Sequence, residues 1–225
     1  MSRIESPPAS GSVAVFPLPN TVFYPGTVLP LHIFEPRYRA MVRDAAAGDH
    51  RLVVTLLKPG WEADYEGSPD FHEIATLGRI EDLEPLPDGR FNLRLIGLAR
   101  VRLGATIQDK PYRILRFDAA PETPPADAAG IVVAKLDLLA THGCVLRELL
   151  DLPGDVVVDD SVSFEQAVNS ACASLPIDAE IRQRLLEEDE LAVRGRRVAH
   201  VLDDLLRRIL QLKSLRGAGR SAGEN

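Results

Sequence analysis

The sequence predicts an α+β protein, in which a small β-barrel with one embedded helix is followed by a C-terminal helical bundle. Three observations support this class. Apolar residues follow strand spacing as far as about Ala119, apart from one helical stretch. A proline-rich segment, residues 120–126, then interrupts the pattern, and beyond it apolar residues recur at helical spacing. A barrel is expected because closure of a small sheet removes its exposed edges. The predicted divisions are a disordered tail (1–11), a barrel domain (12–119), a linker (120–126), a helical bundle (127–215) and a second disordered tail (216–225).

The segment that organises the first half runs from Val13 to Tyr38. It is apolar, but prolines divide it at short intervals: Pro17, Pro19, Pro25, Pro30 and Pro36. Proline donates no backbone hydrogen bond, so the segment predicts short, kinked strands of a curved sheet. Pro25-Gly26 fits the central positions of a type II turn. Glu35-Pro36 ends the last of these strands and begins a helix that ends near Gly48.

The next part of the chain predicts a strand and then a long loop. Leu52 to Leu57 is a continuous apolar run of strand length, typical of a strand buried on both faces. Residues 58–73 lack any period and carry Trp61, Tyr65 and Phe71. A loop of this length in a compact domain is either functional or a cover packed on the protein itself.

A hairpin follows. Residues 74–86 and 91–103 have strand character, and Pro87-Asp88-Gly89 between them is a turn signal. Phe91, Leu93 and Leu95 share the face expected in the core, and arginines share the other face. Gly97 predicts a bulge or bend. Residues 112–117 predict one more strand.

The second half predicts helices that form a small bundle. Ile131 to Leu150 has helical spacing, with an interruption expected at Gly143. Ser163 and Gln166 fit a capping box at the start of another helix. Asp178 can cap the next helix, and Val198 to Leu210 predicts the last one.

Bulk properties exclude some classes of function. The net charge of −7 makes a general nucleic-acid-binding surface unfavourable. Cys144 and Cys172 lack metal-ligand spacing and are expected as reduced, buried thiols. No uninterrupted apolar run reaches the ~18 residues of a membrane span, and the opening residues do not resemble a signal peptide. A cytoplasmic protein without cofactors or metals is therefore expected, of undetermined oligomeric state.

Two blocks of sequence resemble the N-terminal, substrate-binding domain of Lon protease. The first contains Phe16-Pro17-Leu18, Val22-Phe23-Tyr24-Pro25-Gly26, Leu29-Pro30-Leu31 and Ile33-Phe34-Glu35-Pro36-Arg37-Tyr38. The second contains Leu77-Gly78-Arg79-Ile80 and Leu95-Ile96-Gly97-Leu98-Ala99-Arg100-Val101-Arg102. The resemblance implies a PUA-like barrel followed by helices, in a stand-alone member of the family. It also implies binding of unfolded or damaged polypeptide, or an adaptor role beside a separate protease or chaperone.

The chemistry of the full Lon protease is not expected here. That enzyme joins this domain to an ATPase module and a serine-lysine peptidase module. The sequence contains no G-x-x-x-x-G-K-[ST] motif to hold phosphates, and none of its lysines follows a nucleophile motif. His142 and Cys144 lie two residues apart on a predicted helix, so their side chains diverge. We therefore predict a non-catalytic binding module.

Two sets of residues are candidates for binding. The candidate peptide-binding residues are aromatic: Phe23, Tyr24, Trp61, Tyr65 and Phe71. They either form an exposed apolar groove or pack on one another and on the barrel, and packing is the more common outcome. The alternative is RNA binding through an arginine-rich hairpin face: Arg90, Arg94, Arg100 and Arg102. That alternative depends on fold analogy, and a solvated polar face explains the same pattern. An enzyme with an unrecognised site under the 58–73 loop is the least favoured hypothesis.

Overall fold

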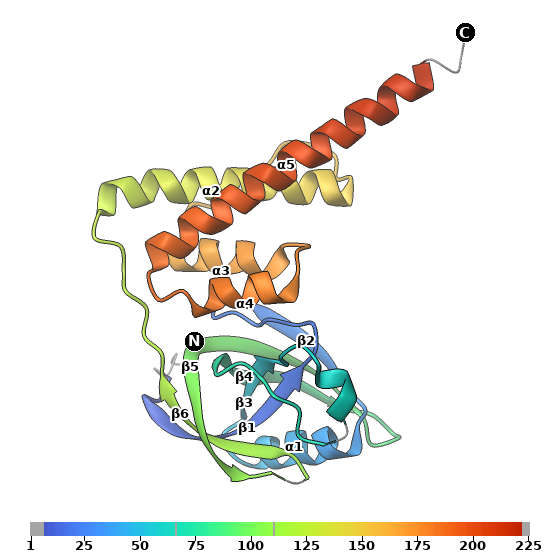
Figure 1. Cartoon of the computed structure of the whole chain (residues 1–225), viewed down its shortest axis with the longest axis vertical. Coiled ribbons are helices and arrows are strands. Elements are labelled where there is room, and N and C mark those ends of the chain that lie inside the picture. Colours follow the sequence, from blue (N-terminus) through green and yellow to red (C-terminus); the bar gives the residue numbers. More distant parts are fainter. Residues whose placement is uncertain (1–6, 66, 110, 222–225) are drawn as a thin grey trace. The chain divides into compact units, whose positions relative to one another are not determined.

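The computed structural model describes residues 7–65, 67–109 and 111–221, which form an α+β fold with one mixed six-stranded sheet (Figure 1). The predicted fold class is confirmed at this level. The strands are β1 (Ser10–Leu18), β2 (Val28–Ile33), β3 (Arg51–Leu56), β4 (Ile74–Pro85), β5 (Phe91–Gln108) and β6 (Arg113–Ala119). The helices are α1 (Pro36–Ala47), the 3-10 turn η1 (Trp61–Asp64), α2 (Ala128–Leu150), α3 (Phe164–Ser174), α4 (Ala179–Glu187) and α5 (Leu191–Ser221).

The sheet owes its mixed character to one parallel pair. β1 runs parallel to β3, and the crossover between them contains β2 and α1. The remaining pairs are antiparallel. Together with the parallel pair, they lead from β5 through β4, β3, β1 and β6 back to β5 (Figure 1). In the described residues β2 pairs with β5 alone, so it is an edge strand.

The Pro25-Gly26 turn meets the bend in β5. Gly26 has a positive φ of 74°, and the Thr27 amide donates to the Tyr24 carbonyl at 3.3 Å, as the predicted type II turn requires. The Gly97 amide donates to the Thr27 carbonyl at 2.9 Å, and the Gly26 amide donates to the Gly97 carbonyl at 2.9 Å. The register of β4 against β5 shifts between Leu77 and Gly78, opposite this point. The bend predicted at Gly97 is therefore present.

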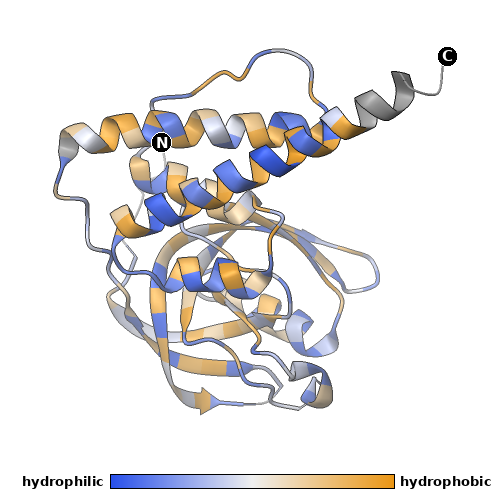
Figure 2. Ribbon diagram, turned by 45° about the horizontal axis from the view of Figure 1, so that its top comes forward, coloured by the Kyte–Doolittle hydropathy of each residue, from blue (hydrophilic) through white to orange (hydrophobic). Residues whose placement is uncertain are grey.

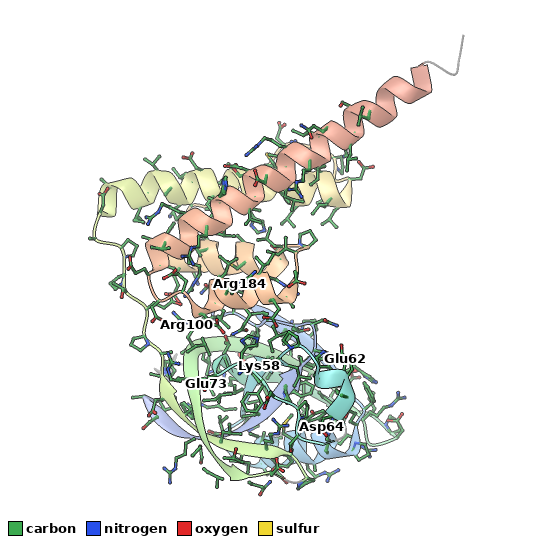
Figure 3. The ribbon with its side chains drawn as sticks, viewed as in Figure 1. Lys58, Glu62, Asp64, Glu73, Arg100 and Arg184 are labelled. Atoms are coloured by element: carbon green, nitrogen blue, oxygen red, sulfur yellow. The ribbon has the colours of Figure 1, made fainter. Side chains whose placement is uncertain are left out.

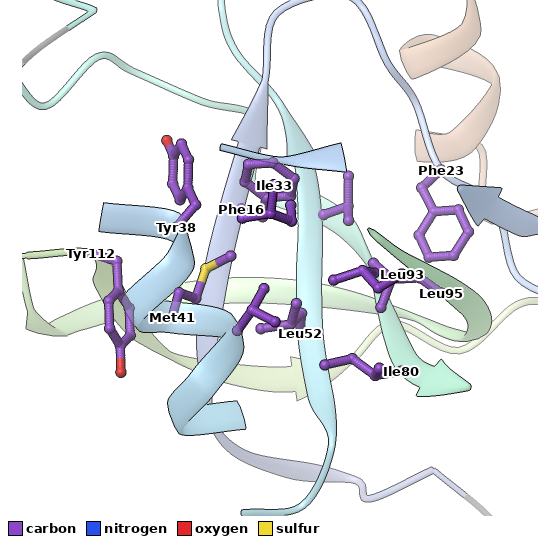
Figure 4. Packing of buried hydrophobic residues seen from close by; sticks show 12 residues of the cluster. Phe16, Phe23, Ile33, Tyr38, Met41, Leu52, Ile80, Leu93, Leu95 and Tyr112 are labelled. Carbon is purple, nitrogen blue, oxygen red and sulfur yellow. The ribbon is translucent and has the colours of Figure 1, made fainter. Parts of the chain in front are cut away.

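Two apolar clusters form the core of the strand-rich part. The first joins α1 to the sheet and is drawn in Figure 4, where Met41 and Leu52 face each other between helix and strands. The Phe16 and Tyr38 rings pack edge-to-face, with centroids 4.6 Å apart. The second cluster contains Val15, Leu77, Val101 and their neighbours. Each fully buried aliphatic side chain stabilises the fold by about 2 kcal/mol.

The chain divides into two compact units, and α4 belongs to the strand-rich one. The first unit contains residues 1–122 and 176–189, and the second contains 123–175 and 190–225. The Gln183 side chain donates to the Ile74 carbonyl at 2.9 Å, and the Tyr24 hydroxyl donates to the Arg182 carbonyl. This position differs from the predicted one in the helical bundle (127–215), because the apolar period of a helix does not show which partner covers it.

The predicted tails also differ from the structure. β1 already begins at Ser10, where residues 10–15 pair with β6, and α5 continues to Ser221. Residues 1–6 and 222–225 lie outside the described residues.

The second unit is built from α2, α3 and α5. The capping box is confirmed: the Ser163 hydroxyl accepts from the Gln166 amide at 3.1 Å, and the Ser163 amide donates to the Gln166 side chain at 2.9 Å. The buried Arg194 donates to the Asn169 side-chain oxygen at 3.0 Å, which joins α5 to α3. α2 passes through Gly143 without the predicted interruption.

One helix in the described residues is long and apolar enough to cross a membrane by length and composition alone. It is the Ala129–Leu150 part of α2, and apolar residues recur along it (Figure 2). It does not stand out as an apolar run in the sequence, because charged residues such as Lys135 and Asp137 divide it. The core helix of a globular protein has the same length and composition, so this finding alone does not identify a membrane span.

Candidate functional site

The predicted loop is a segment whose two ends are held side by side. The Lys58 amide donates to the Asp70 carbonyl, and the His72 amide donates to the Leu56 carbonyl, both at 2.9 Å. Between them, Gly60 has a φ of 91° and turns the chain into η1. Figure 3 labels Lys58, Glu62, Asp64 and Glu73 along this segment. We call residues 58–73 the aromatic segment.

The aromatic segment brings Trp61 and Tyr65 together. Their rings pack edge-to-face with centroids 5.5 Å apart, and both side chains are partly exposed. The Tyr65 hydroxyl donates to the Glu35 carboxylate at 2.7 Å, which fixes the ring against the start of α1. Phe71 is also partly exposed and lies under the Arg113 guanidinium, 5.1 Å from its ring centroid. These three residues offer apolar surface to a ligand.

Phe23 and Tyr24, the other two candidates, are buried. They are 3% and 0% exposed, respectively. Phe23 belongs to the apolar cluster of Figure 4, and the Tyr24 hydroxyl is used in the contact with Arg182. A binding role for the five residues stays a prediction, but these two have almost no surface to contribute to it.

A small cavity of about 260 Å³ opens beside Trp61. Its lining combines apolar and charged residues of the aromatic segment: Lys58, Pro59, Gly60, Trp61, Asp64, Ser68, Pro69 and Asp70. Pockets for drug-sized ligands start at roughly 300 Å³. The cavity therefore suits a single side chain of a larger ligand better than a whole small molecule.

The edge of β2 that faces away from β5 is a second candidate contact surface, which the sequence pattern does not locate. The Gly97 amide of β5 donates to the Thr27 carbonyl, so this carbonyl faces β5. Because backbone groups alternate along a strand, those of Val28, Pro30 and His32 face away from β5. Pro30 contributes a carbonyl but no amide N–H. Val28 is 53% exposed, and Phe34, just beyond β2, is 60% exposed. The sequence signal for this edge was a short apolar strand that contains a proline.

A larger hollow of about 720 Å³ adjoins this edge. Leu31, Leu83 and Leu93 form its apolar floor, and it is bordered by polar and charged residues: His32, Glu81, Asp82, Glu84, Asn92 and Arg94. Unpaired backbone groups beside an apolar hollow are the features that let an extended peptide add to a sheet.

The four arginines proposed for RNA binding each have an acidic partner. Arg90 pairs with Asp88, Arg94 with Asp82 at 2.7 Å, and Arg102 with Glu73 at 3.6 Å. Arg100 is only 3% exposed, and its guanidinium meets Asp189 and Glu122. Figure 3 labels Arg100 close to the end of α4. RNA binding stays a prediction that this arrangement does not favour, because the arginine charges are neutralised locally and one of them is buried.

The second unit contains one histidine–hydroxyl pair and two cysteines. His142 lies 2.6 Å from the Ser174 hydroxyl, and burial lowers the pKa of its imidazole. Cys172 is buried and Cys144 is partly exposed, and neither forms a disulfide bond within the described residues. In the part of the chain that the structure describes, no three His, Cys, Asp or Glu side chains lie close enough to hold a metal ion.

Comparisons with known proteins agree on one family. The family model described as ATP-dependent protease La (LON) substrate-binding domain matches residues 12–204. Lon protease 2 of Myxococcus xanthus is 27% identical over 202 residues, which are 89% of this chain and 24% of that protein. Lon protease of Anaeromyxobacter dehalogenans is 26% identical over 202 residues, again 89% of this chain and 24% of that protein. The chain thus spans about a quarter of the length of these relatives.

Solved structures show the same fold. A Lon N-terminal domain protein from Xanthomonas campestris matches with a TM-score of 0.56 and 24% identity, over 84% of this chain and 96% of that one. The N-terminal domain of Mycobacterium avium complex Lon protease matches with a TM-score of 0.59 and 19% identity, over 88% of this chain and 98% of that one.

Proposed function

Because this chain belongs to the ATP-dependent protease La (LON) substrate-binding domain family, we propose that it binds unfolded or damaged segments of polypeptide and catalyses no reaction itself. The family match over residues 12–204 is the observation that carries the proposal. Only the substrate-binding domain is matched, and no ATPase or peptidase module is recognised in the chain. Within the cell we place it in the cytoplasm, where it acts as an adaptor for a separate protease or chaperone.

Two surfaces of the strand-rich unit support binding of an extended polypeptide. Trp61 and Tyr65 supply partly exposed aromatic area, which binds apolar side chains of many sequences without demanding one sequence. The free edge of β2 supplies main-chain hydrogen bonds, which are independent of sequence. Both features suit a receptor for unfolded chains. The circular order of strand pairing supports the further proposal of a PUA-like barrel as the scaffold.

The proposal is tested with a labelled, permanently unfolded polypeptide whose C-terminus is amidated. Binding is followed by fluorescence anisotropy, and the intrinsic fluorescence of Trp61, the single tryptophan of the chain, reports on the aromatic segment. We expect saturable binding and a shift of the tryptophan emission. Trp61→Ala should weaken binding about tenfold, since a partly buried aromatic contact is worth roughly 1–2 kcal/mol.

Val157→Ala is the matched control. Val157 is the most exposed of the large apolar side chains, at 92%, and it lies in the second unit, outside the aromatic segment. It should leave the affinity unchanged. Failure of the unfolded polypeptide to bind, or equal losses in the two variants, would contradict the proposal.

A further inference from the structure

A third hollow of the strand-rich unit is lined by residues at the start of α1. It has a volume of about 240 Å³. Its polar lining comes from Arg37, Tyr38, Tyr65, Asp109, Tyr112 and Arg113. Its apolar lining includes Val15 and Leu57. The segments that supply these residues are far apart in sequence, so the hollow exists only in the folded unit.

Arg37 has a partly buried guanidinium, and only some of its N–H groups are used in hydrogen bonds to the described residues. Its Nε donates to the Glu35 carboxylate at 3.0 Å, and its Nη1 donates to the Tyr65 carbonyl at 3.2 Å. A guanidinium carries more N–H donors than these two bonds use. The side chain is 21% exposed, and the ring of Tyr38, 4.6 Å away, holds it in place.

Arg113 supplies the second guanidinium. Its side chain is 11% exposed, and its Nη1 donates to the Pro69 carbonyl at 2.8 Å. The Asp109 carboxylate lies 3.6 Å from its Nε, too far for a hydrogen bond, and also accepts from the Ser68 hydroxyl. This guanidinium is therefore incompletely neutralised.

Tyr38 contributes a hydroxyl without a partner. The residue is 6% exposed, and none of the described residues forms a hydrogen bond with its hydroxyl. Figure 4 shows that hydroxyl directed away from Met41 and the apolar core. Burial, opposed by the Arg37 charge, raises the pKa of Tyr38 to about 12, so the hydroxyl keeps its proton and can donate it to a ligand.

The start of α1 adds to the positive potential. The first-turn amides of a helix have no partner within the helix, and here Glu35 makes no side-chain cap bond to them. The aligned peptide dipoles correspond to roughly half a positive charge at this end. Arg37 and Tyr38, which line the hollow, lie in the first turn of α1, so the positive end of the helix is beside it.

The charges favour an anion that carries a single negative charge. Glu35 and Asp109 each offset one arginine, so the net charge of these four side chains is close to zero. An anion is then attracted by the unused N–H groups of the two arginines, by the Tyr38 hydroxyl and by the helix terminus. Together these can balance the single charge of a carboxylate. A phosphate dianion would add a second charge that nothing here balances.

We propose that this hollow binds the free α-carboxylate at the C-terminus of a polypeptide, with Arg37, Arg113 and the Tyr38 hydroxyl as donors. The inference rests on the proposed function and names the end of the chain that is held. A liquid water occupies ~30 Å³, so the volume equals roughly eight waters, enough for a carboxylate and one side chain. The apolar walls then suit an apolar last residue. Capture of a terminal carboxylate is a recurrent mode of peptide recognition.

The test compares two short peptides, acetyl-Gly-Gly-Leu with a free carboxylate and the same peptide with a C-terminal amide. Titration of the whole chain is followed by NMR chemical shifts, with acetate and inorganic phosphate as further probes. We expect the acid to bind at least about tenfold more tightly than the amide, since a charge-assisted hydrogen bond is the difference. Acetate should compete weakly, and phosphate should not compete better than acetate.

Single substitutions distinguish the loss of a ligand-binding donor from the loss of protein stability. Tyr38→Phe removes only the hydroxyl and should weaken binding of the acid about tenfold while the free energy of unfolding is unchanged, because the hydroxyl forms no hydrogen bond with the described residues. Arg113→Gln should weaken it by a similar factor. Arg207→Gln, which removes an exposed arginine paired with Asp204 in α5, is the matched control and should have no effect.

Equal binding of the acid and the amide, or an unchanged affinity of Tyr38→Phe, would overturn the inference. Tighter binding of phosphate than of the acid would overturn it as well. The proposed function is judged independently, because its own probe is an unfolded polypeptide with an amidated end. That probe can bind through the aromatic segment while the carboxylate inference fails.

Discussion

Gly97 illustrates how one residue decides the course of two strands. A Cβ at this position would lie 2.2 Å from the Tyr24 carbonyl oxygen and 3.0 Å from the Pro25 Cα, both atoms of the backbone. The absence of a side chain lets the Pro25-Gly26 turn approach β5 and form two backbone hydrogen bonds with it. Glycine is required here because the backbone of Tyr24 and Pro25 lies where a side chain would be.

Gly97→Ala should therefore lower the free energy of unfolding by about 3 kcal/mol, as for a side chain forced into a tightly packed site. Chemical denaturation measures the change. Gly104→Ala is the control in the same strand, because its new Cβ would meet only the Arg116 carbonyl, at 3.7 Å. Similar losses in the two variants would show that the contact with Tyr24 is not the cause.

Two tyrosines make stability depend on pH in the alkaline range. Burial raises the pKa of Tyr38 to about 12, and burial together with the hydrogen bond to Asp44 raises the pKa of Tyr112 to about 12. A tyrosine in the unfolded chain has a pKa of about 10. The folded state thus holds these protons more tightly, and the stability this confers is complete below about pH 10 and is lost as the pH rises towards 12.

The denaturant midpoint should accordingly fall between about pH 10 and pH 12. The double variant Tyr38→Phe, Tyr112→Phe should show a shallower fall, because the two groups no longer ionise. Near-ultraviolet absorbance of tyrosinate follows the titration directly. Ionisation of both residues near pH 10 in the folded wild-type chain would contradict the assignment.

The helices of the second unit depend on local signals at their ends. α3 begins at a capping box, in which Ser163 and Gln166 satisfy each other's backbone amides. Such a cap is worth about 1 kcal/mol. α2 begins with a simpler cap, in which the Asp127 carboxylate accepts from the amides of Ala129 and Gly130.

Ser163→Ala should lower the stability of the second unit by about 1 kcal/mol, measured by urea denaturation followed by circular dichroism. Ser170→Ala provides the contrast, because this exposed residue lies inside the same helix, where alanine is the better helix former by about 0.5 kcal/mol. The two substitutions should change stability in opposite directions. A loss in both would mean that the cap is not what distinguishes them.

β2 is the element with the clearest division between structural and binding roles. One edge pairs with β5, while the other bears free backbone groups and a proline. An exposed edge favours unwanted association, and a proline reduces that tendency by removing a donor. An incoming peptide strand would therefore find donors at Val28 and His32 but not at Pro30.

At the scale of the whole molecule, the two units do not follow the order of the chain. α4 is preceded and followed by residues of the second unit, yet its contacts are with the strands. His72, at the end of the aromatic segment, lies 3.2 Å from Glu180 and 3.0 Å from Glu187, both on this helix. The helix should therefore unfold together with the strands.

Leu77→Ala tests this by weakening the strand-rich unit. Leu77 is fully buried, and its truncation should cost about 3 kcal/mol. Native-state hydrogen exchange should show that the amides of β4 and α4 lose protection together while those of α3 keep theirs. Val168→Ala, at a fully buried position in α3, should lower the protection of the α3 amides and leave that of β4 and α4 unchanged. Loss of protection in α4 only with the second variant would show that the helix is stabilised by its sequence neighbours instead.

Much of this fold follows from local sequence. The prolines of the opening segment, the Pro25-Gly26 turn, the start of α1 at Pro36 and the capping box at Ser163 all correspond to the structure. Each depends on the conformational preferences of a few adjacent residues, and those preferences are written in the chain itself. The family resemblance was also visible, because its motifs are contiguous.

Tertiary structure decided everything that depends on residues far apart in sequence. It placed Phe23 and Tyr24 in the core, turned Arg100 towards Asp189, and joined α4 to the strands. It also assembled the hollow of Arg37, Tyr38 and Arg113. Periodicity reports that a face is apolar or charged but not which distant segment covers or neutralises it, because that is set by long-range packing, which no local pattern of residues encodes.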